Sequence, residues 1–220
     1  MPDFILPGAA DRATFIGPTG SGKTILAASV LSRQRFDKRP WVCLDFKNEE
    51  LWDKVKSPPM QMLKVGDMPG KRGLYRMPVS PSQDDALESW LWKVWHRGNI
   101  GIFSDEQSLV PRGDAMKAIL RQGRSLLIPC LMCTQRPVGC DREVFTESQY
   151  ISVFSIEDKE DMKLVKGYTR DAPIERALPQ FYSYWYDRPR KNFMVLQPSP
   201  PPDIVAEDLR RVAPVSWWNK

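Results

Sequence analysis

Short apolar runs recur along the chain, and polar, glycine or proline residues separate them. An apolar run that stops at a polar or acidic residue is typical of a strand buried inside a parallel sheet. Runs of this kind cover residues 13–16, 41–46, 100–104 and 150–156, and another ends at residue 133. The pattern therefore predicts a set of buried parallel strands.

Amphipathic segments lie between these runs. From Ser82, which can cap a helix, Leu87, Trp90, Leu91, Val94 and Trp95 return at helical spacing. We expect this apolar face to lie in the core rather than to stack on nucleic-acid bases. Further helices are expected over residues 25–35, 115–123 and 157–167. Strands and helices in alternation predict an α/β fold with a central, mostly parallel sheet flanked by helices.

The C-terminal part follows a different pattern. Residues 181–186 and 192–196 flank a charged turn and predict a closing β-hairpin, with aromatic rings packed on the sheet. The proline-rich stretch 198–202 predicts a stiff, extended spacer. We expect one motor domain over residues 1–197 and a Pro-rich tail or arm over 198–220. The tail could reach a neighbouring subunit, with its final tryptophans, Trp217 and Trp218, docking on a partner.

Composition places the chain among globular proteins. Its 220 residues are 42% hydrophobic, enough for a sizeable core. The net charge of +5 suits an anionic partner such as nucleic acid, but fits a merely basic surface equally well. With no apolar run of about eighteen residues and no basic leader segment, we expect neither a transmembrane helix nor secretion.

The cysteines and the histidine offer little chemistry. Cys130 and Cys133 form a nominal C-x-x-C on a predicted strand, where residues three apart face opposite sides. A redox pair or zinc site is therefore not expected. His96 is the single histidine, too few for a histidine-based metal site.

Residues 17–24 carry the strongest signal. They read Gly17, Pro18, Thr19, Gly20, Ser21, Gly22, Lys23, Thr24, the G-x-x-x-x-G-K-T pattern of a phosphate-binding loop (P-loop). Glycines let the backbone N–H groups close around the phosphates of ATP. Lys23 would act in catalysis on the β- and γ-phosphates, and the Thr24 hydroxyl would bind Mg²⁺. The flanking strand and helix are the context that this motif requires.

Two adjacent acids, Asp105 and Glu106, end the strand over residues 100–104. This is the form of a Walker B motif, in which Asp105 would hold Mg²⁺ directly or through water. Glu106 would orient and polarise the attacking water, which predicts hydrolysis rather than nucleotide binding alone. The strand that ends at 133 leads to Gln135, whose side chain is placed to sense the γ-phosphate or the water. Asp45, at another strand tip, could hold ligand or cap the next turn.

Together these motifs resemble the HerA/FtsK superfamily of ring-shaped, DNA-pumping P-loop ATPases. Four pieces match: residues 17–24, 45–47, 105–106, and the G-R of 123–124 followed by T-Q-R-P at 134–137. The resemblance covers residues 13–165. We expect a compact protein that lacks the membrane anchor, barrel and winged-helix module of larger members. That compactness is most similar to the small genome-packaging ATPases of tectivirus-type, membrane-containing double-stranded DNA viruses.

The resemblance implies a homo-hexamer with nucleotide at the subunit interfaces. It also implies an arginine that reaches the γ-phosphate of a neighbouring subunit. Arg124 matches the family's G-R position and is the first candidate, and Arg136 is the runner-up. Arg121 and Arg170 remain open.

The function that this implies is ATP-driven translocation of double-stranded DNA, as in a viral packaging motor. DNA would pass through a basic pore that holds its phosphates independently of sequence. Arg112, Lys71 and Arg72 are pore candidates, and Arg76 is a further phosphate contact candidate. Portal or vertex proteins would be partners, in the host cytoplasm or at the packaging vertex of the virion. Alternatives are a phage assembly or secretion ATPase with another cargo, and a small-molecule kinase or nucleotide-binding scaffold.

Overall fold

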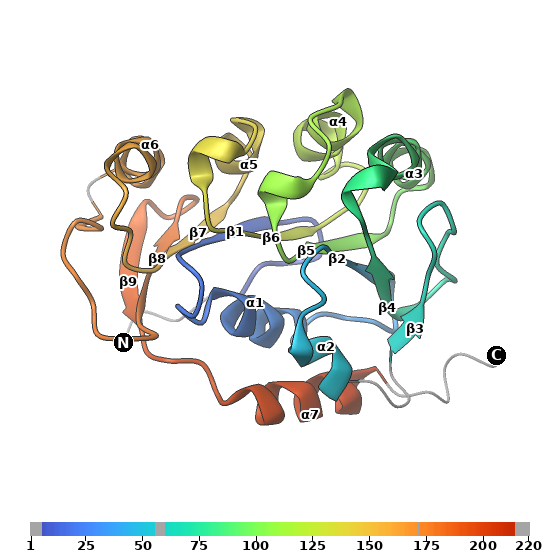
Figure 1. The fold of residues 1–220 in the computed structure, drawn as a ribbon, viewed down its shortest axis with the longest axis horizontal. Helices are drawn as coiled ribbons and strands as arrows, with labels where there is room; N and C mark the ends of the chain where they lie inside the picture. The colour runs from blue at the N-terminus through green and yellow to red at the C-terminus, as the bar shows by residue number, and fades with distance from the viewer. Residues whose placement is uncertain (1–5, 56–59, 171, 214–220) are drawn as a thin grey trace.

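A nine-stranded sheet forms the centre of the molecule, in the order β3-β4-β2-β5-β6-β1-β7-β8-β9 (Figure 1). The computed structural model describes residues 6–55, 60–170 and 172–213. The strands are β1 (Arg12–Ile16), β2 (Pro40–Asp45), β3 (Met60–Met62), β4 (Gly73–Pro78), β5 (Gly101–Ser104), β6 (Cys130–Thr134), β7 (Tyr150–Val153), β8 (Ser183–Asp187) and β9 (Asn192–Leu196).

Helices cover both faces of this sheet. They are α1 (Lys23–Leu31), α2 (Glu50–Lys54), α3 (Asp84–Arg97), α4 (Asp114–Gln122), α5 (Glu143–Thr146), α6 (Lys159–Thr169) and α7 (Pro202–Val212). Figure 1 shows α3, α4, α5 and α6 on one face, and α1, α2 and α7 on the other. None of the helices in the described part of the chain is long and apolar enough to cross a bilayer.

The sheet is parallel from β3 to β7, and only β8 and β9 run antiparallel to their neighbours. The predicted α/β fold, with its mostly parallel sheet and closing hairpin, is confirmed. Parallel strands place their carboxyl ends at one edge. The P-loop after β1, the acids after β5 and the polar segment after β6 therefore meet there.

The core has two parts, one on each face of the sheet. Trp90 and Leu91 of α3 are fully buried against one face, as the helical pattern predicts. Trp185 of β8 is buried on the other face, stacked on Tyr150 with ring centroids 5.4 Å apart. The hairpin aromatics of β8 thus pack on the sheet, as expected.

The cysteine pair behaves as the strand geometry predicts. Cys130 packs in the core on one face of the sheet and Cys133 in the core on the other. Both are free, and burial raises the pKa of the Cys130 thiol to about 12. These residues are packing groups.

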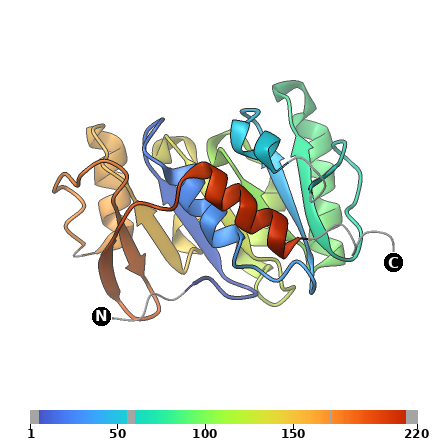
Figure 2. The ribbon, with the colours of Figure 1, turned by 90° about the horizontal axis from the view of Figure 1, so that it is seen from below.

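The segment after the hairpin differs from the extended tail that the prolines suggested. Residues 198–201 are not helical, but α7 begins at Pro202, a residue well suited to a first helical turn. Its apolar side, with Val205, Ala206 and Leu209 buried, packs on α1 and α2 of the same chain (Figure 2). The proline-rich composition masked the helical spacing of these residues. Trp217 and Trp218 lie outside the described residues.

Gly101 offers a test of core packing at the start of β5. Its neighbour on β2 is Trp41, and a Cβ at Gly101 would lie 2.2 Å from the Trp41 ring, which is buried. Gly101→Ala should therefore lower the free energy of unfolding by about 1–3 kcal/mol, measured by urea denaturation. Gly167→Ala is the matched control, because nothing lies within 4 Å of its Cβ position on α6. Equal stability of the two variants would contradict this packing.

Candidate active site

The P-loop joins β1 to α1, the context that the motif requires. Gly20 and Gly22 have φ angles of 76° and 93°, in the left-handed region that favours glycine. No side chain caps the N-terminus of α1. The first N–H groups of the helix are therefore available to an anion, and the helix dipole favours negative charge there.

Lys23 and Ser21 show that this loop fits a charged ligand. Lys23 is 4% exposed, and its ammonium contacts the Pro18 carbonyl oxygen at 3.4 Å. It forms no ion pair with any residue that the structure describes, and burial lowers its pKa. The Ser21 hydroxyl is buried without a hydrogen-bond partner. Buried polar groups of this kind are normally satisfied, and a triphosphate would satisfy both.

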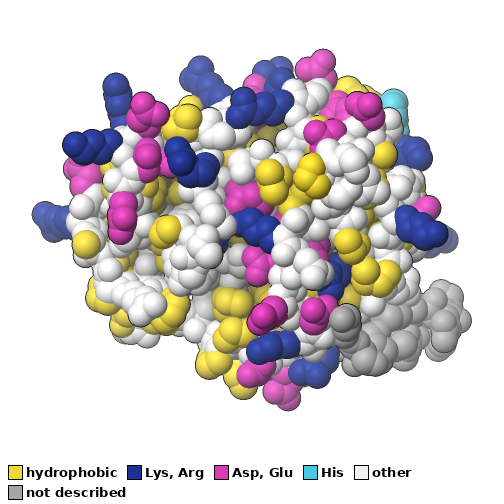
Figure 3. All heavy atoms as spheres, in the orientation of Figure 1, with side chains coloured by type: hydrophobic (Ala, Val, Ile, Leu, Met, Phe, Trp, Pro, Cys, Tyr) yellow, Lys and Arg dark blue, Asp and Glu magenta, His cyan; other side chains and the backbone are white. Residues whose placement is uncertain are grey.

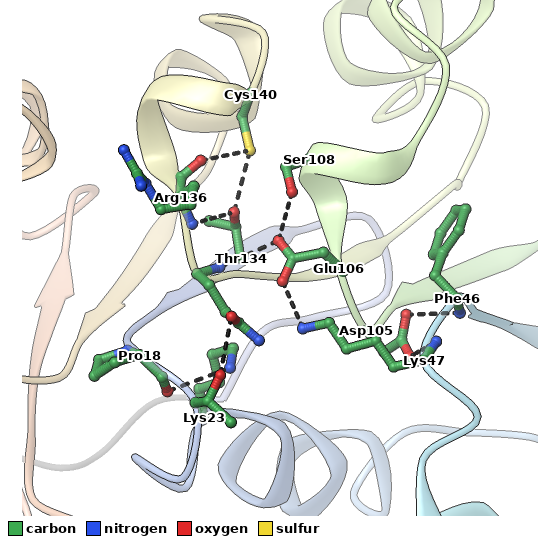
Figure 4. Close-up of polar contacts among 12 residues, drawn as sticks. Pro18, Lys23, Phe46, Lys47, Asp105, Glu106, Ser108, Thr134, Arg136 and Cys140 are labelled. Carbon is green, nitrogen blue, oxygen red and sulfur yellow. Dashed lines mark hydrogen bonds and ion pairs between the residues drawn. The ribbon is translucent and has the colours of Figure 1, made fainter. Parts of the chain in front are cut away.

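Glu106 is held by three donors (Figure 4). The Lys47 ammonium lies 2.6 Å from Oε2, while the Ser108 hydroxyl at 2.8 Å and the Gln135 backbone N–H at 3.1 Å donate to Oε1. Burial alone would raise the pKa of Glu106, but Lys47 and the hydrogen bonds lower it below its usual value. The carboxylate is therefore ionised and fixed above the P-loop.

Asp105 connects the tips of β5 and β2. Its side chain is fully buried, and its two oxygens accept the backbone N–H groups of Phe46 at 3.0 Å and Lys47 at 3.1 Å. Burial, with Asp45 nearby, raises the pKa of Asp105 to about 7. Among the described residues no cluster of three or more His, Cys, Asp or Glu forms a metal site. Mg²⁺ binding by Thr24 and Asp105 stays a prediction.

Gln135 joins the P-loop to the Walker B glutamate. Its Oε1 accepts the Thr19 hydroxyl at 3.0 Å, and its backbone N–H reaches Glu106. A group in this position touches both the phosphate-binding loop and the residue expected to orient water. The sensing role of Gln135 stays a prediction.

Lys47 and Ser108 were assigned no role from the sequence. The adjacency of β2 and β5 brings Lys47 to Glu106, and Ser108 reaches it from a short 3-10 turn, η2 (Gln107–Leu109). Lys47 stands two residues beyond the end of β2, so knowledge of the strand order would have found it. Ser108 gave no comparable signal.

Arg76 and Asp45 are structural. Arg76 is 3% exposed, and its guanidinium donates to Asp45 at 2.7 Å, Asp53 at 2.8 Å and Asn48 at 2.7 Å. The expectation that Arg76 contacts DNA phosphates is therefore wrong for this fold, because burial removes its charge from the surface. Asp45 also accepts the Glu49 N–H at 3.1 Å, which favours the capping role over ligand binding.

The candidate arginines lie at different edges. Arg124 is exposed between α4 and the amino end of β6, opposite the edge that carries its own P-loop. Arg136 lies beside the site, where its exposed guanidinium contacts Asp161 at 3.1 Å. Arg121 pairs with Glu143. Lys71 and Arg72 precede β4 at the amino edge, whereas Arg112 follows β5 and donates to the Gly139 carbonyl.

Comparison with solved structures identifies the fold. The genome-packaging NTPase B204 of Sulfolobus turreted icosahedral virus 2, in complex with ATP-γS, superposes with a TM-score of 0.65 at 15% identity, over 88% of this chain and 100% of that one. EssC (ATPases 2 and 3) from Geobacillus thermodenitrificans superposes with a TM-score of 0.66 at 13% sequence identity, over 96% of this chain and 45% of that one. At these identities the likeness establishes the fold.

Sequence comparison goes further. No protein-family model matches the chain. The DNA packaging ATPase P9 of Enterobacteria phage PRD1 is 33% identical over 211 residues, which cover 91% of this chain and 92% of that protein. The resemblance to the small genome-packaging ATPases of viruses is thereby confirmed. With this identity over nearly the full length of both proteins, the chain belongs to the family of the PRD1 DNA packaging ATPase.

Proposed function

We propose that this protein hydrolyses ATP between the P-loop and Glu106 and uses the energy to drive double-stranded DNA into a viral capsid. The observation that carries the proposal is Glu106, held by Lys47 at the strand tip that faces the loop and Lys23, which forms no ion pair with a described residue. The 33% identity to a DNA packaging ATPase supports ATP as the substrate and DNA as the cargo. No observation favours a cargo other than DNA or transfer of phosphate to a metabolite.

The nucleotide would be held from the loop. Backbone N–H groups within residues 19–24 bind the phosphates, and the Lys23 ammonium neutralises the charge that develops on the γ-phosphate. Thr24 and Asp105 would hold Mg²⁺, which supplies further charge stabilisation to the phosphate oxygens.

Glu106 orients the water that attacks the γ-phosphate and accepts its proton at the carboxylate. Lys47 keeps that carboxylate ionised, and Ser108 and Gln135 hold its direction. Because Gln135 also contacts Thr19, a change at the phosphates can move the segment after β6. That segment continues into Arg136, so hydrolysis at the phosphates could shift the position of Arg136.

A ring explains the placement of Arg124. A guanidinium at the amino edge cannot reach the P-loop at the carboxyl edge of its own sheet, but it can serve the nucleotide of an adjacent subunit. We therefore propose a homo-hexamer in which Arg124 completes the neighbouring site, with Arg136 as the alternative. DNA phosphates would contact the Arg112 loop or the Lys71 and Arg72 turn. The ring would act at the packaging vertex, with portal or vertex proteins as partners.

Glu106→Gln should lower kcat of DNA-stimulated ATP hydrolysis by about 100-fold or more while leaving nucleotide binding intact, because the amide cannot accept the proton. Phosphate release, measured with and without double-stranded DNA, checks this outcome. The matched control is Glu207→Gln, at an exposed position on α7. ATPase activity that is indifferent to DNA of any form would contradict the translocase.

Lys47→Met should shift the acid limb of the pH profile of kcat/KM to higher pH. Lys47 lowers the pKa of Glu106, so its loss lets the carboxyl take up a proton at a higher pH than in the parent protein. Steady-state ATPase rates across the acidic range measure the shift, and Lys47→Arg should preserve the parent profile. An unchanged acid limb in Lys47→Met would show that the ion pair does not set this pKa.

Arg124→Ala should abolish ATP hydrolysis, by about 1,000-fold if it serves as a trans arginine. Lys23→Ala should be inactive for a different reason, the loss of nucleotide phosphate contacts. Mixed rings should regain activity, because a Lys23→Ala subunit supplies Arg124 to the intact P-loop of an Arg124→Ala neighbour. ATPase assays over a series of mixing ratios test this. Rescue with Arg136→Ala instead would transfer the role to Arg136.

A further inference from the structure

An apolar cavity of about 310 Å³ adjoins the P-loop. Gly22 and Ile25, at the start of α1, form its inner side, Phe181 forms one wall, and the proline-rich segment 198–202 forms the other. Glu106 approaches the loop from the opposite side, because β1 lies between β6 and β7 and Phe181 stands two residues before β8. The loop thus has a polar, catalytic side and an apolar side.

The two walls are built to remain in place. Phe181 holds a φ angle of 68°, a conformation that bulky residues adopt only under constraint, and the residue is 45% exposed. A Cβ at Gly22 would lie 3.2 Å from the Phe181 ring, so glycine there lets the aromatic approach the loop. Prolines on the other wall have fixed φ angles and carry no N–H. In Figure 3 hydrophobic side chains gather at the lower left, where Figure 1 places the hairpin and the start of α7.

We propose that this cavity holds the base of the nucleoside triphosphate, stacked on Phe181. The inference rests on the proposed function, since it takes the phosphates to lie in the P-loop. Gly22 and Ile25 belong both to the loop-helix junction and to the cavity, so a nucleotide whose phosphates occupy the loop continues directly into it. The volume lies at the lower end of the range of roughly 300–1,000 Å³ for small-molecule sites. A flat aromatic wall suits a base, because every base has a π-face.

The lining also predicts how the base is chosen. Ser199 is the one polar side chain among the residues that line the cavity. The Pro201 carbonyl is already engaged by the N–H groups of Ile204 and Val205 in the first turn of α7. A site that reads an amino or keto group needs buried donors and acceptors to reject the wrong base. This cavity therefore accepts adenine and guanine alike, and ATP and GTP should be hydrolysed with kcat/KM values within about fivefold of each other.

Calorimetric titration with ATP-γS, GTP-γS and inorganic tripolyphosphate tests the base site. Phe181→Ala should weaken both nucleotides by about tenfold, because base–aromatic stacking is lost, and leave tripolyphosphate binding unchanged. Phe181→Trp should retain nucleotide affinity. Phe193→Ala is the matched control, since Phe193 is 38% exposed on β9, away from the cavity lining. Unchanged nucleotide affinity in Phe181→Ala, or an equal loss for tripolyphosphate, would overturn the proposal.

Two results separate this inference from the proposed function. If tripolyphosphate and both nucleotides fail to bind the parent protein, the P-loop assignment fails and the base site fails with it. Suppose instead that all three ligands bind the parent protein and that Lys23→Ala abolishes their binding, but that the affinity for the ATP analogue exceeds that for the GTP analogue by about 100-fold or more. The proposed function is then retained. In that case the claim that the cavity does not distinguish adenine from guanine is overturned.

Discussion

The site depends on a partly buried ion pair that joins two strand tips. Lys47 follows β2 and Glu106 follows β5, and their charged atoms lie 2.6 Å apart with Glu106 almost completely buried. A carboxylate withdrawn from water is costly unless it is paired and hydrogen-bonded. Here the pair, with Ser108 and the Gln135 backbone, makes the ionised form the stable one. The fold thus holds an ionised carboxylate next to the P-loop.

The P-loop has two sides of different chemistry. Polar groups from β2, β5 and β6 approach one side, where Glu106 and Gln135 meet the loop. Apolar groups that flank β8 and lead into α7 approach the other, where Phe181 faces the prolines. In the proposed account, hydrolysis takes place on the polar side and the base binds on the apolar side. The helix α7 follows directly from the apolar wall and packs on α1, the helix that follows the P-loop.

Much of this organisation could be predicted from local sequence. The glycines and Lys23 of the P-loop, and the acids that end β5, carry their own chemistry, and apolar runs located the buried strands. Lys47 was not assigned a role because its function depends on which strand lies beside β2, and strand order is a long-range property. The helix α7 was missed because prolines at its start resemble a spacer. The sequence pattern placed Phe181 with the aromatic residues that pack on the sheet. Only its exposure and its positive φ angle in the structure distinguish it from those core residues.

The central claim is that the triphosphate lies in the loop over residues 17–24 with its γ-phosphate facing Glu106. A crystal structure with ATP-γS and Mg²⁺ tests it most directly. The account predicts the β- and γ-phosphates within hydrogen-bond distance of the loop N–H groups and the Lys23 ammonium, with the Glu106 carboxylate directed at the γ-phosphate. Nucleotide bound elsewhere, or Glu106 turned away from the γ-phosphate, would contradict the account.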